Sequence, residues 1–313
     1  MRQSTTRKKL IIVICVIILM APLHGLTSAT LWAQSWVHLS TAQGELPPPS
    51  ASKEQTSSLI LDIDRDGVND FVIGIRGQPG PSLVWYRRTS AGWTKYLIED
   101  TVLSIEAGGA YYDIDGDGDL DIVMGGDYQS NQVWWWENPY PNYDPAVGWT
   151  RRLIKDSGQN KHHDQLFGDF DEDGAAELAF WNQNAHALML AEIPDDPRAT
   201  EPWSITPIYT WTDGAEHEGL TQADIDGDGT PDLVGGGRWF KHTTGANFTA
   251  NVIDDNRRFA RAAAGQLIDG GRPEVVFVCG DCDGPLMMYA WDGANWVGRN
   301  LLGADVRHGH TLA

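Results

Sequence analysis

The sequence is poor in basic residues. Its 313 residues include 43 Asp and Glu against 23 Lys and Arg, which gives a formal charge of −20 at pH 7. Nucleic acid binding needs a basic surface that neutralises the phosphates, so this balance excludes nucleic acid as a main partner. The sequence also lacks the Gly-rich phosphate loop and the dinucleotide fingerprint, which argues against a nucleotide ligand.

Cysteine is scarce as well. The chain has three cysteines, Cys15, Cys279 and Cys282, and the last two lie three residues apart after an apolar run. Nothing near them has the helix-opening context of a redox motif, and no second pair completes a zinc site. Export would favour a disulfide between Cys279 and Cys282. Half of a metal site, a redox pair and two unpaired thiols are the alternatives.

After residue 33, the sequence lacks the 3.6-residue apolar period of amphipathic helices. It contains 34 Gly and 14 Trp, and its apolar runs are short, rich in Val, Ile, Trp and Tyr, and separated by Gly, Pro and Asn. Such runs are strand signals. A hydrophobic content of 42% is enough for a sizeable core. We therefore predict an all-β fold.

Residues 1–33 have the layout of a secretory signal peptide. Arg7, Lys8 and Lys9 precede an apolar stretch at residues 10–23, and small residues follow near Ala29. This stretch is shorter than the roughly 20 residues that a membrane-spanning helix needs. We expect cleavage between residues 29 and 34 and a secreted, periplasmic or cell-surface location. An uncleaved signal segment, the alternative, would be the only expected contact with a membrane.

Four acidic segments recur at nearly constant spacing. They are DIDRDGVND from residue 62, DIDGDGDLD from residue 113, DFDEDGAAE from residue 169 and DIDGDGTPD from residue 224. Short apolar runs follow each of them, and aromatic runs follow most. Counting the segment that enters each acidic loop, every repeat holds four strands. This pattern predicts a β-propeller with the aromatic side chains buried between four-stranded blades.

The ends of the repeat region are irregular. A fifth repeat at residues 265–278 keeps Glu274 and the apolar run but lacks the leading aspartates. We expect a first strand at SWVHLS and a linker within residues 34–56, and propeller repeats over residues 57–313. The last segment, RHGHTLA, resembles the entry into another loop. Five full repeats and two orphan strands predict a fragment of a larger ring of about seven blades. A complete, smaller or imperfectly closed ring is the alternative.

The acidic loops have the composition of calcium sites. Positions 1, 3, 5 and 9 carry carboxylates, position 6 is glycine, and the position 7 carbonyl can join the same focus. Calcium accepts six to eight oxygens in flexible geometry. The loops lack the glutamate at position 12 that an EF-hand needs. The predicted ligands of up to four calcium ions are Asp62, Asp64, Asp66, Val68, Asp70, Asp113, Asp115, Asp117, Asp119, Asp121, Asp169, Asp171, Asp173, Ala175, Glu177, Asp224, Asp226, Asp228, Thr230 and Asp232.

The loops and the FVIGIRG and DIVMGG runs after them resemble the FG-GAP and VCBS repeats of integrin-α-type propellers and their bacterial secreted relatives. The resemblance covers about residues 57–313. It implies a calcium-binding propeller, in a family whose members serve as adhesion, scaffold or enzyme domains. The function that we predict first is a binding or scaffold domain for an extracellular carbohydrate or protein ligand.

A second group of residues precedes the acidic loops by six or seven positions. It contains Glu106, His162 with His163, and His217 with Glu218. Arg258 and Arg261 precede the fifth loop, and His308 and His310 precede the missing one. Equivalent positions on successive blades face the same end of the central channel, so these side chains are expected to form one ring. Such a ring could hold a transition metal or supply a general base with a cationic partner. Hydrogen bonding of each histidine to a neighbouring loop is the alternative.

The segments KHHDQLFGDFD and HEGLTQADIDGDG resemble the propeller part of aldos-2-ulose dehydratases, and calcium propellers also occur among rhamnogalacturonan lyases. This resemblance implies that His163 or His217 abstracts a proton or binds a metal, and that Arg258 clamps an anion. The second predicted function is therefore a sugar lyase or dehydratase. Its candidate residues are His162, His163, His217, Glu106 and Arg258.

Overall fold

The computed structural model describes residues 37–309 except residue 53. The chain divides into the units Met1–Leu39 and Ser40–Ala313, and the strands among the described residues all lie in the second unit. The predicted signal peptide lies outside the described residues. Of the strand expected at SWVHLS, residues 37–40 are described and belong to no strand. Ser40 caps the short 3₁₀-helix η1 (Thr41–Gln43).

The described residues form twenty strands in five antiparallel sheets of four, each a simple meander. The sheets are β1 (Glu54–Leu61), β2 (Asp70–Arg76), β3 (Leu83–Thr89) and β4 (Gly92–Glu99); β5 (Ala110–Tyr112), β6 (Asp121–Gly125), β7 (Val133–Glu137) and β8 (Thr150–Lys155); β9 (His162–Gly168), β10 (Glu177–Asn182), β11 (Ala187–Glu192) and β12 (Ile205–Thr210); β13 (Thr221–Ala223), β14 (Asp232–Gly235), β15 (Arg238–Thr244) and β16 (Asn247–Val252); β17 (Ala260–Gly265), β18 (Glu274–Cys279), β19 (Asp283–Trp291) and β20 (Trp296–Arg307). A 3₁₀-helix, η2 (Asp255–Arg257), precedes the fifth sheet.

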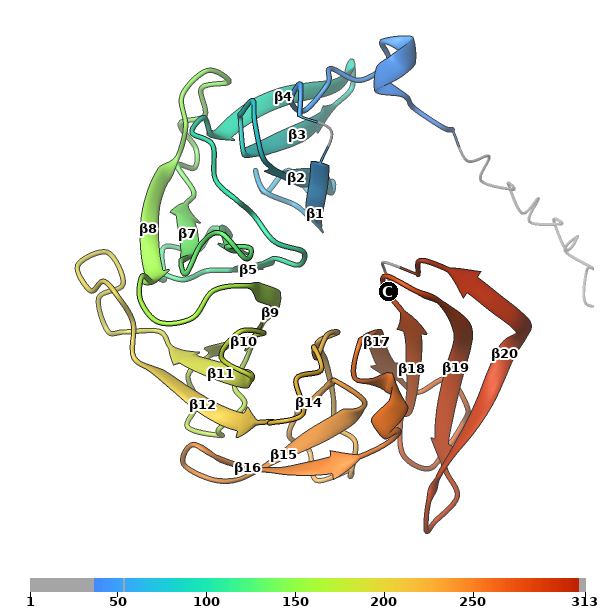
Figure 1. Cartoon of the computed structure of the whole chain (residues 1–313). Helices are drawn as coiled ribbons and strands as arrows, with labels where there is room; N and C mark the ends of the chain where they lie inside the picture. The colour runs from blue at the N-terminus through green and yellow to red at the C-terminus, as the bar shows by residue number, and fades with distance from the viewer. Residues whose placement is uncertain (1–36, 53, 310–313) are drawn as a thin grey trace, which may run out of the picture. The chain divides into compact units, whose positions relative to one another are not determined.

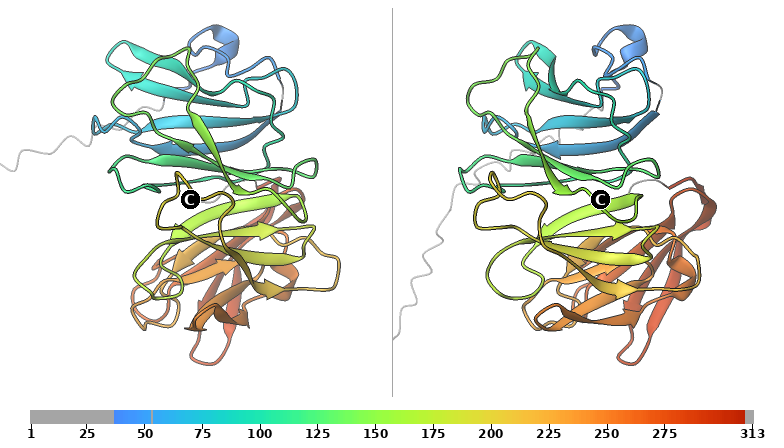
Figure 2. Two further views of the ribbon diagram at one scale, coloured as in Figure 1. Left: turned by 90° about the vertical axis from the view of Figure 1, so that its left-hand side faces the viewer. Right: turned by 60° about the vertical axis from the view of Figure 1, so that its left-hand side comes forward.

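The five sheets are the blades of a propeller. They follow one another around a central space, with β1, β5, β9 and β17 innermost (Figure 1). Side views show the second sheet between the first and the third (Figure 2). The predicted four-stranded propeller repeat is therefore confirmed, and a ring of more than five blades stays a prediction.

Aromatic and branched side chains fill the space between consecutive sheets. Trp85 and Trp134 belong to the cluster between the first and second sheets, Trp135 to the next cluster and Trp181 to the third. Consecutive tryptophans alternate between the two faces of β7, so Trp135 points away from Trp134. Side chains of the third sheet cover Trp135, which is completely buried.

The fifth sheet leaves one face less covered than the others. At the second loop position Ile63 is fully buried, whereas its counterpart Leu267 is 60% exposed. Ile98, near the end of β4 in the first sheet, is buried, whereas its counterpart in the fifth sheet, Leu301 of β20, is 41% exposed. Within the described part of the chain, no hydrophobic cluster joins the fifth sheet to the first.

Cys279 and Cys282 form a disulfide that closes the connection between β18 and β19, with Cα atoms 5.4 Å apart. The predicted disulfide is thus present. In the portion of the chain that the structure describes, no helix is long and apolar enough to span a membrane.

In each sheet, the first strand separates the position of the predicted His, Glu and Arg group from the loop that follows the strand. His163 lies near the start of β9, and the acidic loop that begins at Asp169 follows the end of β9. Six residues of extended chain span roughly 20 Å at about 3.3 Å per residue. The acidic loops and the histidine positions therefore lie at opposite ends of the innermost strands.

Candidate functional site

The acidic loops connect the first and second strands of the first four sheets. In each loop at least three carboxylates contribute an oxygen to a group whose atoms lie within 4.8 Å of one another. The groups are Asp62, Asp64 and Asp66; Asp113, Asp115 and Asp117; Asp169, Asp171, Asp173 and Glu177; and Asp224, Asp226 and Asp232. The convergence expected from alternating carboxylates is therefore present in all four loops.

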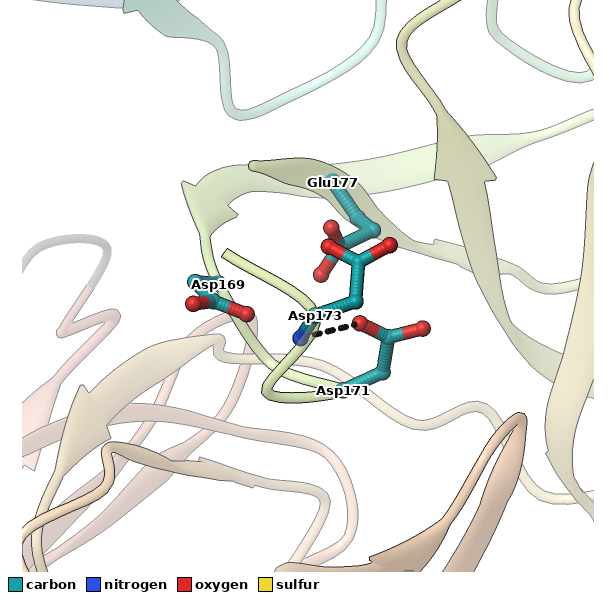
Figure 3. A group of neighbouring side chains, drawn as sticks. All are labelled: Asp169, Asp171, Asp173 and Glu177. Carbon is teal, nitrogen blue, oxygen red and sulfur yellow. Dashed lines mark hydrogen bonds between the residues drawn. The ribbon is translucent and has the colours of Figure 1, made fainter. Parts of the chain in front are cut away.

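The third loop contains the largest group. The carboxylates of Asp169, Asp171, Asp173 and Glu177 approach one another inside the turn (Figure 3). The Asp173 amide donates a hydrogen bond to Oδ1 of Asp171 at 3.3 Å. Backbone donors thus hold these side chains in place within the loop.

Hydrogen bonds to the first aspartate close each loop. Oδ2 of Asp113 accepts from the amide of Gly118 at 3.0 Å, and Oδ2 of Asp169 accepts from the amide of Gly174 at 3.2 Å. Gly118 and Gly174 have φ values of 93° and 91°, which residues with a Cβ rarely adopt. The glycine at position 6 therefore allows the turn that brings the carboxylates together.

The acid at position 9 is buried and ties the loop to the sheet. Oδ1 of Asp70 accepts from the amide of Arg88 at 2.7 Å, and Oε2 of Glu177 accepts from the amide of Phe170 at 2.8 Å. In the fifth loop, Oε2 of Glu274 accepts from the amides of Leu267 and Ile268 at 2.9 Å each. Because Glu274 makes these bonds in a loop without the other acids, this position has a structural role of its own.

Burial makes these acids poor anions unless a cation is near. Burial, together with neighbouring carboxylates, raises the pKa of Asp121 to about 8 and the pKa of Glu177 to about 7. Buried oxygens without a hydrogen-bond donor include Oδ2 of Asp70, Oδ1 of Asp169 and Oε1 of Glu177. Oxygens of this kind are what a hard divalent cation binds, so the donor set fits calcium.

The chain's own basic side chains contact three of the loops. Nη2 of Arg198 lies 2.6 Å from Asp115 and 2.8 Å from Asp117, Arg87 contacts Asp64, and Lys241 contacts Asp226. In the third loop the described ion pair is His242 with Glu172, which is not one of the four grouped acids. These contacts offset part of the repulsion between the carboxylates.

The residues at position 7 face the loop with their backbone. The amides of Val68, Ala175 and Thr230 donate to the carboxylates at position 5 at 2.8 to 3.0 Å. Asp119, the remaining residue at this position, is only 4% exposed, and burial raises the pKa of its carboxyl to about 7. Asp228 pairs with Lys241 rather than with the group of its own loop.

A cavity of about 780 Å³ lies at the other end of the innermost strands. Glu106 and His163 line it, together with Glu218, Arg261 and Arg76. The sequence thus placed Glu106 and His163 correctly in one concavity. We call this space the central cavity.

His163 lies between two carboxylates in the central cavity. Its Nδ1 is 3.2 Å from Oε1 of Glu218, and its Nε2 is 3.6 Å from Oε2 of Glu106. Burial alone would lower the pKa of His163, but the neighbouring carboxylates of Glu106 and Glu218 outweigh burial, and the pKa is raised. The imidazolium form keeps no lone pair free for a metal or for a substrate proton.

The two carboxylates beside His163 differ in their ionisation. Glu106 has its pKa lowered to about 2, because His163 and Arg76 outweigh the effect of burial. Glu218 has its pKa raised to about 7, since burial outweighs the charges of His163 and Arg261. The cavity therefore contains one firmly ionised carboxylate and one that titrates near neutral pH.

The other predicted histidines do not reach the central cavity. His162 is fully buried, its Nδ1 contacts the carbonyl oxygen of Gly126 at 2.9 Å, and burial lowers its pKa to about 3. His217 stacks on Trp211 with ring centroids 4.1 Å apart, and burial lowers its pKa to about 4. Both are neutral packing residues between blades. The expected gathering of three histidines is not observed, because neighbouring residues of a strand point to opposite faces.

Arg258 also lies outside the central cavity lining. Its guanidinium pairs with Asp213 and Asp255. Among the described residues, the groups able to hold a metal are the four acidic loops, and none of them includes a histidine. The residues around His163 therefore give no support to the predicted transition metal site.

Sequence reasoning missed several residues of the central cavity. Arg76 comes from the end of β2, Asp164 from β9, and Asp281 from the disulfide-closed connection after β18. Arg76 and Asp281 occupy other positions of the repeat than His163. Only the curvature of the ring brings such positions together, and no spacing in the sequence indicates it.

Comparisons with known proteins support the repeat type. Residues 113–180 match the family model described as an FG-GAP-like repeat. This region contains the second and third acidic loops, so the resemblance to FG-GAP repeats is confirmed there. A search of curated protein sequences found no match.

Two solved structures are similar in backbone. The biofilm matrix protein Bap1 of V. cholerae is 13% identical, with a TM-score of 0.49 over 83% of this chain and 42% of Bap1. The rhamnogalacturonan lyase YesW is 14% identical, with a TM-score of 0.42 over 79% of this chain and 49% of the lyase. This chain spans less than half the length of either protein.

Proposed function

We propose that this chain is a secreted, calcium-stabilised propeller that binds an extracellular carbohydrate or protein ligand. The observation that carries the calcium part is the equivalent grouping of carboxylates in four successive blades. Without a cation, three or four carboxylates so close together repel one another. A bound calcium ion would attract these carboxylates and so stabilise the loop that connects the first two strands of the blade.

Chelation is expected to lower the melting temperature strongly. Extracellular calcium sites have dissociation constants of about 10⁻⁴ to 10⁻³ M, and at tenfold that concentration each site adds about 1.4 kcal/mol to the free energy of unfolding. The measurement is thermal unfolding of the full chain in excess calcium and in excess EDTA. An unchanged melting temperature would contradict the calcium assignment.

The third loop offers a matched pair of variants for the same experiment. Asp171→Asn removes one carboxylate of the group in the third loop. Because loss of this site would leave three of four, the calcium-dependent rise in melting temperature should fall by about a quarter. Asp195→Asn removes an exposed charge outside the loops and should leave the rise unchanged. Equal behaviour of the two variants would argue against a specific site at the third loop.

A sugar lyase or dehydratase is the second candidate function. The observation that favours it is Glu218, a carboxyl with a pKa of about 7 that lies 3.2 Å from Nδ1 of His163 in a cavity. In this reaction class, a base takes the proton on carbon next to a carbonyl or carboxyl group, and the electron pair of that C–H bond forms a double bond. The neighbouring C–O bond breaks, and its electron pair leaves with the oxygen, which takes a proton from water. Glu218 would take the proton, in place of the histidines suggested by the resemblance. Ultraviolet absorbance of unsaturated sugars, lost in Glu218→Gln, is the measurement, and its absence with sugar polymers would exclude this function.

A further inference from the structure

One position on the third strand of each sheet lies beside the acid at position 9 of the loop. In the third sheet this residue is Glu192, which pairs with Glu177 across β10 and β11. In the other three sheets with acidic loops, the equivalent residue follows the strand partner of position 10 and is Arg87, Glu137 or Lys241. We call this the facing position. It is basic in the first and fourth sheets and acidic in the second and third.

The basic residues at the facing position contact acids of their own loop. Arg87 forms an ion pair with Asp64 of the first loop, and Lys241 forms one with Asp226 of the fourth loop. Both aspartates belong to the converging carboxylate groups of these loops. A calcium ion that binds there has to displace a positive side chain or share its partner, and the two like charges repel each other.

The second loop receives its basic residue from the neighbouring sheet. Nη2 of Arg198, in the connection between β11 and β12, lies 2.6 Å from Asp115 and 2.8 Å from Asp117. Its Nε lies 2.9 Å from Glu137, and Arg152 also pairs with Glu137. Two guanidinium groups thus compensate the acid at the facing position, and one of them also contacts the loop itself.

The third loop has no such counter-charge among the described residues. Within this part of the chain, neither the four grouped acids nor Glu192 forms an ion pair. His242 pairs with Glu172, an acid outside the group. The facing residue adds a further carboxylate directly opposite Glu177, and like charges in this arrangement are unfavourable.

Two oxygens of the third loop also lack a hydrogen bond in the described chain. They are Oδ1 of Asp169 and Oε1 of Glu177, and both are buried. Glu177 is completely buried, and its side chain lies against those of Asp171 and Asp173 (Figure 3). Buried carboxylate oxygens without a partner are costly. A divalent cation would therefore relieve more unfavourable energy in the third loop than in the other three.

We propose that the four loops differ in calcium affinity, that the third loop binds calcium most tightly, and that the charge at the facing position sets this order. This inference rests on the proposed calcium function. Glu192 would attract the ion although the loop motif does not include it. Arg87, Lys241 and, in the second loop, Arg198 would compete with the ion for the same carboxylates.

Calcium titration of the full chain against a competing chelator of known affinity measures this order. We expect one tight site and three weaker ones, with dissociation constants at least about tenfold apart. Asp171→Asn should remove the tight site alone. A tighter site stabilises the fold more at a given calcium concentration. The loss in melting temperature of this variant should then exceed the quarter expected from four equal sites.

Charge reversal at the facing position is the specific test. Glu192→Lys gives the third sheet the basic residue of the fourth, and it should weaken the tight site at least about tenfold. Lys241→Glu gives the fourth sheet the acid of the third, and it should create a second tight site. Arg198→Gln should strengthen one weak site, because it removes the contacts with Asp115 and Asp117.

Two exposed residues of β20 provide matched controls. Asp305→Lys and Arg299→Glu make the same charge changes in the fifth sheet, whose loop lacks the leading aspartates. Neither should change a calcium dissociation constant by more than about twofold, since solvent and salt screen distant exposed charges. If Glu192→Lys does not fold, Lys241→Glu tests the inference by itself, because loss of structure does not create a tight site.

Several results would overturn the inference. They are four equal sites in the native chain, a tight site that survives Asp171→Asn, no weakening in a folded Glu192→Lys, no new tight site in Lys241→Glu, and control variants that act as strongly as the facing position. Four equal sites would still support the proposed calcium function. Absence of any calcium binding would reject that function, and the inference with it.

Discussion

At the scale of single residues, the position 9 acid has two roles that the sequence pattern does not separate. Glu177 belongs to the carboxylate group of its loop, and its Oε2 also accepts from the backbone amide of Phe170 at 2.8 Å. Glu274 makes only the backbone contacts. The motif predicted this acid as a metal ligand because spacing shows which residues converge. Spacing does not show which oxygen the backbone already uses.

The central cavity illustrates the same limit at the level of one strand. His162 and His163 are adjacent in sequence, and their shared position before the acidic loop made both candidates. Strand alternation turns only His163 to the cavity, and the packing around β9 decides which of the two this is. The sequence therefore predicted that a histidine would lie there, but not which one.

Glu218 should make the stability of the fold depend on pH. Its folded pKa of about 7 lies above its ordinary value, so its neutral form is favoured in the folded state. The stability it contributes is complete below about pH 4.5 and is lost as pH rises through about 7. The glutamine of Glu218→Gln does not titrate. The free energy of unfolding of this variant, relative to that of the native chain, should therefore rise by about 2 kcal/mol from pH 5.5 to pH 8.5.

Denaturant unfolding at the two pH values measures this difference. The charged groups that face Glu218 are His163 and Asp164 on β9, Arg261 on β17, and Asp281 after β18. The exposed Glu201→Gln variant is the control and should show no such gain. A free energy difference between Glu218→Gln and the native chain that is the same at both pH values would contradict the prediction.

At the scale of the elements, the close approach of β14 to the entry segment of its own sheet depends on glycine. A Cβ on Gly235, at the end of β14, would lie 1.9 Å from the carbonyl oxygen of Gly219. That carbonyl also accepts a hydrogen bond from Nε1 of Trp181 in the preceding blade at 2.9 Å. The short strand β14 therefore fits against the entry segment of its own sheet only where there is no side chain.

Gly235→Ala is expected to destabilise the protein by about 3 kcal/mol or more, because backbone atoms would have to move apart. Gly265→Ala is the matched control, since a Cβ on Gly265 at the end of β17 meets no atom within 4 Å. Its effect should stay within about 0.5 kcal/mol. Urea unfolding of both variants measures the two free energies. A small effect of Gly235→Ala would show that β14 packs less tightly against the entry segment of its sheet than the 1.9 Å approach implies.

At the scale of the whole molecule, a formal charge of −20 has to be reconciled with a compact fold. The carboxylates are concentrated in the four acidic loops at one end of the innermost strands and around the central cavity at the other. Calcium would offset repulsion at the first end, whereas ion pairs with arginine and lysine offset it in the cavity. If the loops bind calcium, the chain has two different means of stabilising buried carboxylates.

The sequence by itself determined the repeating four-stranded unit, the acidic loops and the alternation of tryptophans, since each of these depends on residues near one another in the chain. Only the tertiary structure decided that His163, rather than His162 or His217, joins Glu106, and that Arg76, Arg261 and Asp164 complete the ion pairs. Local hydrogen bonding and strand periodicity are short-range effects, which a repeat makes visible. Which side chains meet across the central cavity depends on the curvature and rotation of whole blades, and no local pattern specifies these.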